Sequence, residues 1–131
     1  MGYTRYWTRT EKPLTEDFVE FCKGVVAKCE KKGIKIRNWD GQGEPTLTTE
    51  CIALNGDDDR EHDRDLAHES FVLSNEAEWN FCKTARKPYD YAVRTILSEA
   101  KKQGFVTGVS SDGANNKIYS DDDYINGRVT W

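Results

Sequence analysis

Side chains alternate in character along residues 3–10, near the start of the chain. Arg5, Trp7 and Arg9 fall on one side of an extended segment, whereas Tyr6 and Thr8 fall on the other. A period of two, in a segment rich in aromatic residues and threonine, predicts a β-strand. We expect the strand to end before Pro13, which interrupts the pattern.

Two longer stretches carry apolar residues at helical spacing. Thr15 precedes the first stretch as a candidate N-cap, and Gly33 follows it as a candidate C-terminal glycine. Pro88 suits the first turn of the second stretch, and Gly104 closes it. The apolar positions are Phe18, Phe21, Cys22, Val25, Val26 and Cys29 in the first helix, and Tyr89, Ala92, Val93, Ile96, Leu97 and Ala100 in the second.

Short apolar or alternating runs at 34–39, 47–55, 69–74, 79–82 and 105–110 predict five further strands. The order of elements is then β-α-β-β-β-β-α-β. This order predicts an α+β fold, a mostly antiparallel sheet of about five to six strands with two amphipathic helices packed on one face. We expect one domain over residues 1–131, in which 111–131 form a polar C-terminal extension.

The formal net charge of −4 argues against a general nucleic-acid or membrane-surface binder. No apolar run approaches the roughly 20 residues that a spanning helix needs. The first residues lack an apolar signal region, so we expect a cytoplasmic protein.

The sequence offers little for metal or nucleophilic chemistry. Its four cysteines form no C-x-x-C pair, and we expect them to be reduced and partly buried. The acidic loop at 57–65 lacks the spacing of a calcium loop, so no metal site and no cofactor are expected. His62 and His68 lie in no recognisable hydrolase pattern, and the chain has no P-loop, G-x-G-x-x-G or nucleophile elbow.

A basic segment precedes the second predicted helix. Free backbone N–H groups and the helix dipole favour an anion at a helix start, and cations nearby strengthen such a seat. We therefore expect this segment to hold a phosphate; the alternative is a solvated basic patch paired with nearby carboxylates. The candidate residues are Lys83, Thr84, Arg86, Lys87 and Tyr89.

The first strand offers a second set of candidates. Arg5 and Arg9 alternate with Trp7, a combination that suits a nucleobase with an attached phosphate. Trp39, near two glycines, is a further candidate for stacking on a base. The alternative is that these aromatic residues form the core or an oligomer interface, with the arginines extending past them.

Four segments of the chain together resemble segments of other proteins. They are MGYTRYW at the start, DGQGEP at 40–45, FCKTARKPYD at 81–90 and VSSDG at 109–113. Together they resemble a family of small phage and prophage proteins that has no assigned catalytic residues. The resemblance covers most of the chain and implies a viral accessory protein acting in the host bacterial cytoplasm. By analogy, it implies a nucleotide sponge that counters host defence.

These observations predict a non-enzymatic protein that sequesters a phosphorylated small molecule, such as a cyclic nucleotide or an ADP-ribose derivative. We expect a homo-oligomer, with Arg5 and Arg9 closing the site. One alternative is an inhibitor or adaptor that docks a host protein. Another is a nucleotide-cleaving enzyme that works through His68 or the acidic loop.

Overall fold

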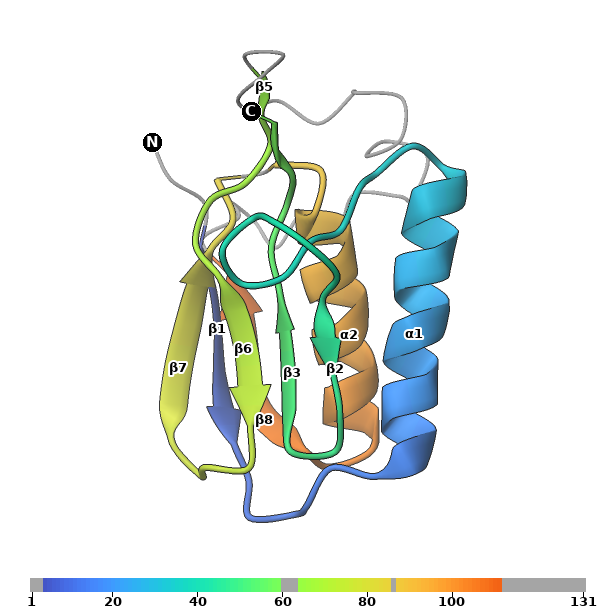
Figure 1. Ribbon diagram of the computed structural model, residues 1–131. Coiled ribbons are helices and arrows are strands. Elements are labelled where there is room, and N and C mark those ends of the chain that lie inside the picture. Colours follow the sequence, from blue (N-terminus) through green and yellow to red (C-terminus); the bar gives the residue numbers. More distant parts are fainter. Residues whose placement is uncertain (1–3, 60–63, 86, 112–131) are drawn as a thin grey trace.

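The computed structural model describes residues 4–59, 64–85 and 87–111 of the 131-residue chain. Within these residues, the helices α1 (Glu16–Lys31) and α2 (Asp90–Lys102) accompany two three-stranded antiparallel sheets and a two-stranded ribbon (Figure 1). The predicted α+β class is confirmed, with the two helices together on one side of the strands. The six strands are divided between two sheets, whereas the sequence analysis expected one.

The first sheet has the order β7-β1-β8, with β1 (Thr4–Arg9) between β7 (Trp79–Lys83) and β8 (Val106–Ser111). Its register places Tyr6 opposite Phe81 and Thr8 opposite Trp79. Because strand side chains alternate, the intervening residues of β1 turn to the other face. That face is the buried one, and it carries Arg5, Trp7 and Arg9.

The second sheet has the order β2-β3-β6, formed by β2 (Thr46–Leu47), β3 (Cys51–Leu54) and β6 (Phe71–Ser74). The sequence analysis expected one strand over 47–55, and this prediction is wrong. The Thr48 hydroxyl accepts hydrogen bonds from the N–H groups of Glu50 and Cys51, at 3.3 and 3.2 Å, and so turns the chain into a hairpin. The ribbon consists of β4 (Asp58–Asp59) and β5 (Arg64–Asp65).

The strand predicted over 34–39 is also absent from the described part of the chain. Ile34 and Ile36 are buried as the alternation indicates, but only Arg37 forms a bridge, with Asn55. The backbone N–H of Asn38 donates instead to carbonyl oxygens of the following turn. The apolar alternation therefore reports burial here without a ladder of strand hydrogen bonds.

The helix α1 follows its sequence signals closely. Thr15 is the N-cap, and its hydroxyl accepts a hydrogen bond from the N–H of Phe18 at 3.2 Å. Gly33 has a φ of 82°, which suits a residue that follows a helix end. The second helix begins at Asp90, two residues after Pro88, and ends before Gly104.

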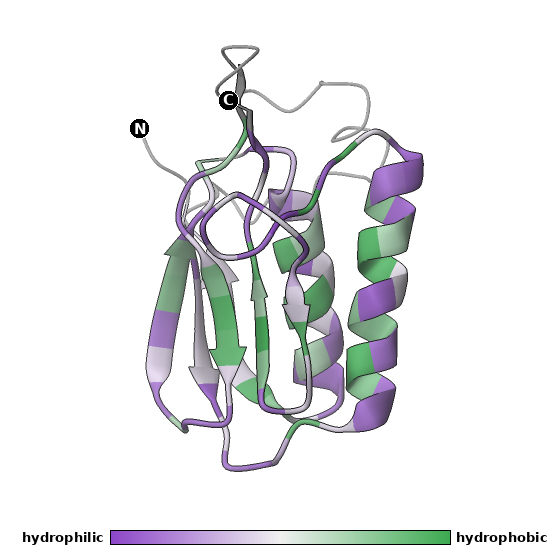
Figure 2. Cartoon of the chain, viewed as in Figure 1, coloured by the Kyte–Doolittle hydropathy of each residue, from purple (hydrophilic) through white to green (hydrophobic). Residues whose placement is uncertain are grey.

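The core lies between the helices and the two sheets. The helix α1 packs against α2, and α2 packs against β8. Figure 2 shows apolar residues along β3 and β6 and in stripes on both helices. Trp7 of the first sheet contacts Phe71 of the second, with ring centroids 5.2 Å apart. Of the predicted C-terminal extension, only Ser111, the last residue of β8, lies within the described residues.

Candidate functional site

The basic segment connects β7 to α2. The N–H of Lys87 donates to the carbonyl oxygen of Thr84 at 2.9 Å, which closes a turn. Within this turn Ala85 adopts a φ of 52°, a left-handed conformation that costs a non-glycine residue about 1–2 kcal/mol. The surrounding contacts therefore hold the segment in a strained shape. Arg86 lies outside the described residues.

The start of α2 does not offer the free N–H groups that the sequence analysis predicted. The N–H groups of Asp90, Tyr91 and Ala92 donate to the carbonyl oxygens of Lys87, Pro88 and Tyr89, at 2.9, 3.1 and 2.9 Å. These short turns satisfy the first N–H groups of the helix within the chain, so the groups are not available to a ligand. The prediction of an anion seat on these N–H groups is therefore wrong.

The protein's own carboxylate occupies the helix start. Asp90 is 1% exposed and accepts two hydrogen bonds from the Arg5 guanidinium, at 2.7 and 2.8 Å. It also accepts one from the Thr84 hydroxyl at 2.8 Å. Arg5 and Thr84 thus bind a buried carboxylate where the sequence analysis expected them to bind phosphate. These contacts fix the segment that follows Lys83 in the chain.

Arg9 also serves the fold. Its guanidinium donates to the carbonyl oxygens of Ser74, Thr10 and Phe105 at 2.7, 2.7 and 3.0 Å, and to the side-chain oxygen of Asn75 at 2.9 Å. Burial lowers the pKa of Arg9. Arg9 is 3% exposed and most of its donors are bound within the chain, so the fold does not favour Arg9 as a residue that closes a site across an oligomer interface.

Trp7 and Tyr89, two of the predicted stacking residues, are each 1% exposed. The Tyr89 hydroxyl donates to the carbonyl oxygen of Glu69 at 2.7 Å, and burial raises the pKa of this phenol. Neither ring has a face open to a ligand. Both are core residues. For Trp7 this agrees with the alternative interpretation of the first strand, and for Tyr89 it agrees with its place among the apolar positions of the second predicted helix.

The exposed aromatic residues of the first sheet lie on its outer face. Trp79 is 59% and Phe81 42% exposed, and the register brings Tyr6 beside them. The rings of Tyr6 and Trp79 stack with centroids 5.9 Å apart, and those of Trp79 and Phe81 are 5.5 Å apart. We call Tyr6, Trp79 and Phe81 the aromatic face.

The charges around the aromatic face suit an anion. None of the residues of β1, β7 and β8 is Asp or Glu, although the chain as a whole is acidic. Lys83 shares the exposed side of β7 with Trp79 and Phe81, because these residues are two apart. The Glu69 carboxylate lies at the Lys83 end of the strand, where it accepts a hydrogen bond from the Lys83 backbone N–H at 2.9 Å.

Hydroxyl groups border the aromatic face on its other side. Thr8 pairs with Thr107, and Tyr6 pairs with Ser110, so these side chains lie on the same outer face as the rings. Thr8, Thr107 and Ser110 are exposed. Such groups can donate to or accept from a polar ring edge or a sugar.

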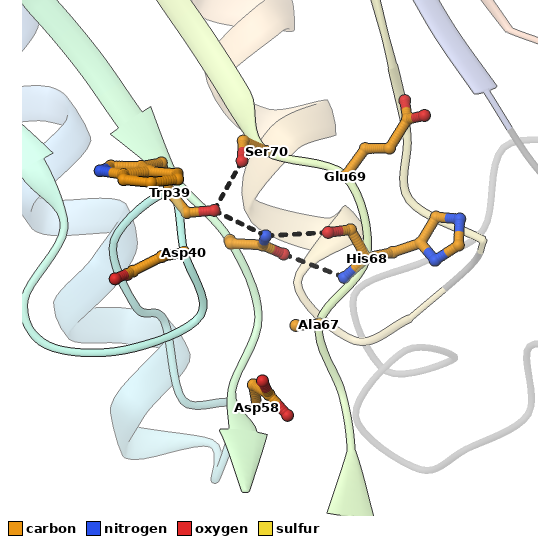
Figure 3. Close-up of a pocket in the computed structure, with 8 residues that line it drawn as sticks. Trp39, Asp40, Asp58, Ala67, His68, Glu69 and Ser70 are labelled. Carbon is orange, nitrogen blue, oxygen red and sulfur yellow. Dashed lines mark hydrogen bonds between the residues drawn. The ribbon is translucent and has the colours of Figure 1, made fainter. Parts of the chain in front are cut away.

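Trp39 lies in a different setting, beside a shallow depression of about 610 Å³ (Figure 3). Asn55 joins its walls, because its side chain donates to the carbonyl oxygens of Trp39 and His68 at 3.0 and 2.9 Å. Among the described residues, the lining includes Asp40, Asp58 and Glu69 and no Lys or Arg. This charge disfavours a phosphate, so the structure does not favour Trp39 as part of a phosphate site.

The alternatives built on other side chains gain little support. His68 lines the depression, but Figure 3 shows its ring pointing away from Asp40 and Asp58. In the acidic loop, Asp57 is bound by Arg37 at 3.1 Å, and residues 60–63 lie outside the described part. Among the described residues, no group of three or more metal-ligating side chains comes together. Burial raises the pKa of the Cys22 and Cys82 thiols to about 12, so both are protonated at neutral pH.

Sequence reasoning missed all three residues of the aromatic face. The signal was the alternation of Trp79, Phe81 and Lys83 with Asn80 and Cys82, which places two rings and a cation on one side of a strand. The alternation alone did not indicate which side would be buried.

Comparison with known proteins found no matching family model, no matching curated protein and no matching solved structure. No helix among the described residues is both long enough and apolar enough to cross a membrane. Function is therefore inferred from the geometry of the described residues and from the sequence.

Proposed function

We propose that this protein binds a nucleotide on the aromatic face and sequesters it without converting it. The observation that carries the proposal is a cluster of three neighbouring rings on one sheet face. The strands of this sheet contain no carboxylate side chain, and β7 ends at Lys83. Nucleobases stack on exposed aromatic rings, and a lysine binds a phosphate as a point charge. The rings would therefore bind the base of a nucleotide, and Lys83 would bind its phosphate.

The basic segment extends the cationic end of this site. Lys83 is exposed, and Lys87 follows it across the turn at Thr84. The strained conformation at Ala85 keeps this turn compact, and the Arg5–Asp90 pair anchors it from below. A small phosphorylated ligand fits the balance of charge better than a long nucleic acid, because the whole chain is acidic.

The resemblance to phage and prophage proteins supplies the biological part of the proposal. A non-enzymatic nucleotide binder in an infected cell would sequester a nucleotide second messenger of host defence in the bacterial cytoplasm. Such a protein acts by mass action and requires tight binding with slow release.

Calorimetry with AMP, ADP-ribose and cyclic dinucleotides tests the proposal. Trp79→Ala should weaken binding on the order of tenfold or more, because one stacking surface is lost. Lys83→Ala should weaken binding of the same ligand and reduce its dependence on salt. Trp39→Ala is the matched control, since Trp39 is as exposed as Trp79 but lies beside carboxylates.

Two results would contradict the proposal. One is the absence of binding heat with every member of the panel, and the other is an equal loss in Trp79→Ala and Trp39→Ala. Heating the loaded protein and identifying the released compound by chromatography tests sequestration separately. Recovery of the intact ligand supports sequestration, whereas a cleaved product favours the enzyme alternative and directs attention to His68.

A host protein is the second candidate partner, because exposed aromatic residues are also enriched at the centres of protein interfaces. This candidate predicts no thermal shift with nucleotides. It also predicts a stable complex with one host protein that Trp79→Ala disrupts and Trp39→Ala preserves.

A further inference from the structure

We propose that the aromatic face holds two bases on separate rings, so that its ligand is a dinucleotide with a bridging phosphate. This inference rests on the proposed function and narrows it, because AMP and ADP-ribose present only one base.

The three rings of the aromatic face do not lie in parallel planes. Tyr6 and Trp79 differ by 22° in plane and stack together, whereas Trp79 and Phe81 differ by 41°. A flat base makes full face-to-face contact only with a ring that lies nearly parallel to it, and a tilted ring contacts it through an edge. One base therefore stacks on the pair of Tyr6 and Trp79 or on Phe81, but not on both. The aromatic face offers two seats.

The spacing of the rings along β7 also suits two bases. Trp79, Phe81 and Lys83 are successive residues on one side of the strand, so their Cα atoms lie roughly 6.5 Å apart. Sheet surfaces that bind single-stranded nucleotides place successive bases on separate aromatic residues in this manner. Two seats at this separation match two unstacked bases joined by one sugar–phosphate link.

Charge sets the length of the ligand. Lys83 is the only charged residue on the outer side of the described strands of this sheet, and it lies next to the Phe81 seat. One lysine on this side of the sheet, with Lys87 across the following turn, fits a ligand with few phosphates. An acidic chain without a cationic stripe on this sheet does not favour a longer strand.

The experiment compares AMP with two dinucleotides by calorimetry. These are the linear ApA, which has one bridging phosphate, and cyclic di-AMP, the cyclic form, which has two. At neutral pH ApA carries one negative charge, whereas AMP and cyclic di-AMP carry about two each. Charge alone would therefore favour AMP over ApA and would not distinguish AMP from the cyclic form. We expect ApA or the cyclic form to bind on the order of tenfold more tightly than AMP, because a second base is stacked.

Variants assign the two seats. Trp79→Ala and Phe81→Ala should each weaken dinucleotide binding by about tenfold, whereas only one of them should weaken AMP binding. Both side chains are exposed, and unchanged thermal melting will show that the variants fold. Trp39→Ala should leave both ligands unaffected.

The outcomes separate the inference from the function beneath it. Equal affinities for AMP and the dinucleotides, with both variants weakening AMP, would overturn the two-seat inference and leave nucleotide binding intact. Failure of AMP and of both dinucleotides to bind wild-type protein would overturn the proposed function together with the inference.

Discussion

Trp79 and Trp39 are almost equally exposed, at 59% and 58%, yet their surroundings differ in every other respect. Trp79 lies beside Tyr6 and Phe81 on a sheet whose strands carry no carboxylate. Trp39 has no ring stacked on it among the described residues and borders a depression lined by Asp40 and Asp58. Exposure alone therefore does not identify a ligand site. Neighbouring rings and the sign of the local charge distinguish the two regions.

The two regions are also anchored differently. A buried ion pair, Arg5 with Asp90, fixes the connection that follows β7. A neutral amide, that of Asn55, fixes the segments around Trp39 through bonds to both. Removing each anchor tests whether the ion pair and the amide also contribute different free energies of unfolding.

Loss of Arg5 should have the largest effect. Arg5→Ala removes both guanidinium hydrogen bonds from the buried Asp90 carboxylate, and breaking such a buried pair costs about 3–5 kcal/mol in the free energy of unfolding. Urea denaturation measures this loss. The double variant Arg5→Ala/Asp90→Ala should lose less than the sum of the two single variants, because no unpaired charge remains.

An exposed ion pair provides the control. Lys23 and Glu20 lie 3.2 Å apart on α1, and both are well exposed. Lys23→Ala should change stability by less than about 0.5 kcal/mol. A loss below about 1 kcal/mol in Arg5→Ala would show that the Asp90 pair does not anchor this region.

Loss of the Asn55 amide should cost less. Its oxygen accepts from the N–H groups of Gly56 and His68, at 2.8 and 3.0 Å, and Asn55→Ala leaves these groups without that acceptor. Unsatisfied buried polar groups cost about 1–3 kcal/mol, which the same denaturation curves will measure. Asn55→Asp is the sharper variant, because it keeps an acceptor for these N–H groups and loses the amide donor to the Trp39 and His68 carbonyl oxygens. If Asn55→Ala were as stable as wild type, the depression would not depend on this amide.

The fold could be predicted from the sequence where the signals were local. The helix α1 has its cap, apolar stripe and terminal glycine within one stretch, and the structure confirms each. The hairpin at Thr48 was missed because its turn contains neither glycine nor proline and depends on a hydroxyl contact. The division into two sheets depends on pairings far apart in the sequence, which no local pattern reports.

The candidate site was predicted only in part, and the reason is again distance in the sequence. The alternation in β1 separated Trp7 from Tyr6 correctly but did not indicate which side would be buried. Arg5 was expected to bind a ligand phosphate, yet its partner is a carboxylate 85 residues away in the chain. The cationic segment was found from composition, whereas the rings next to Lys83 became visible only through the pairing of β7 with β1.

The buried side of β7 can be compared with its exposed side by raising the pH. Burial, with the nearby Glu69 and Asp90 carboxylates, raises the pKa of Cys82 to about 12 from an ordinary value of 9.0. Above pH 9 the unfolded chain releases this proton while the folded chain keeps it. The contribution to stability is therefore complete below pH 9 and falls by about 1.4 kcal/mol per pH unit as the pH rises toward 12. Cys82→Ser should reduce the slope of unfolding free energy against pH by about 1 kcal/mol per pH unit between pH 9 and 10, where the unfolded thiol is still partly protonated, and by nearly the full amount between pH 10 and 11. Cys51→Ser is the control and should reduce it less, because Cys51 is only partly buried. Equal slopes in wild type and Cys82→Ser would mean that water reaches the inner side of β7. The strand that carries Trp79 and Phe81 would then lack a buried inner side.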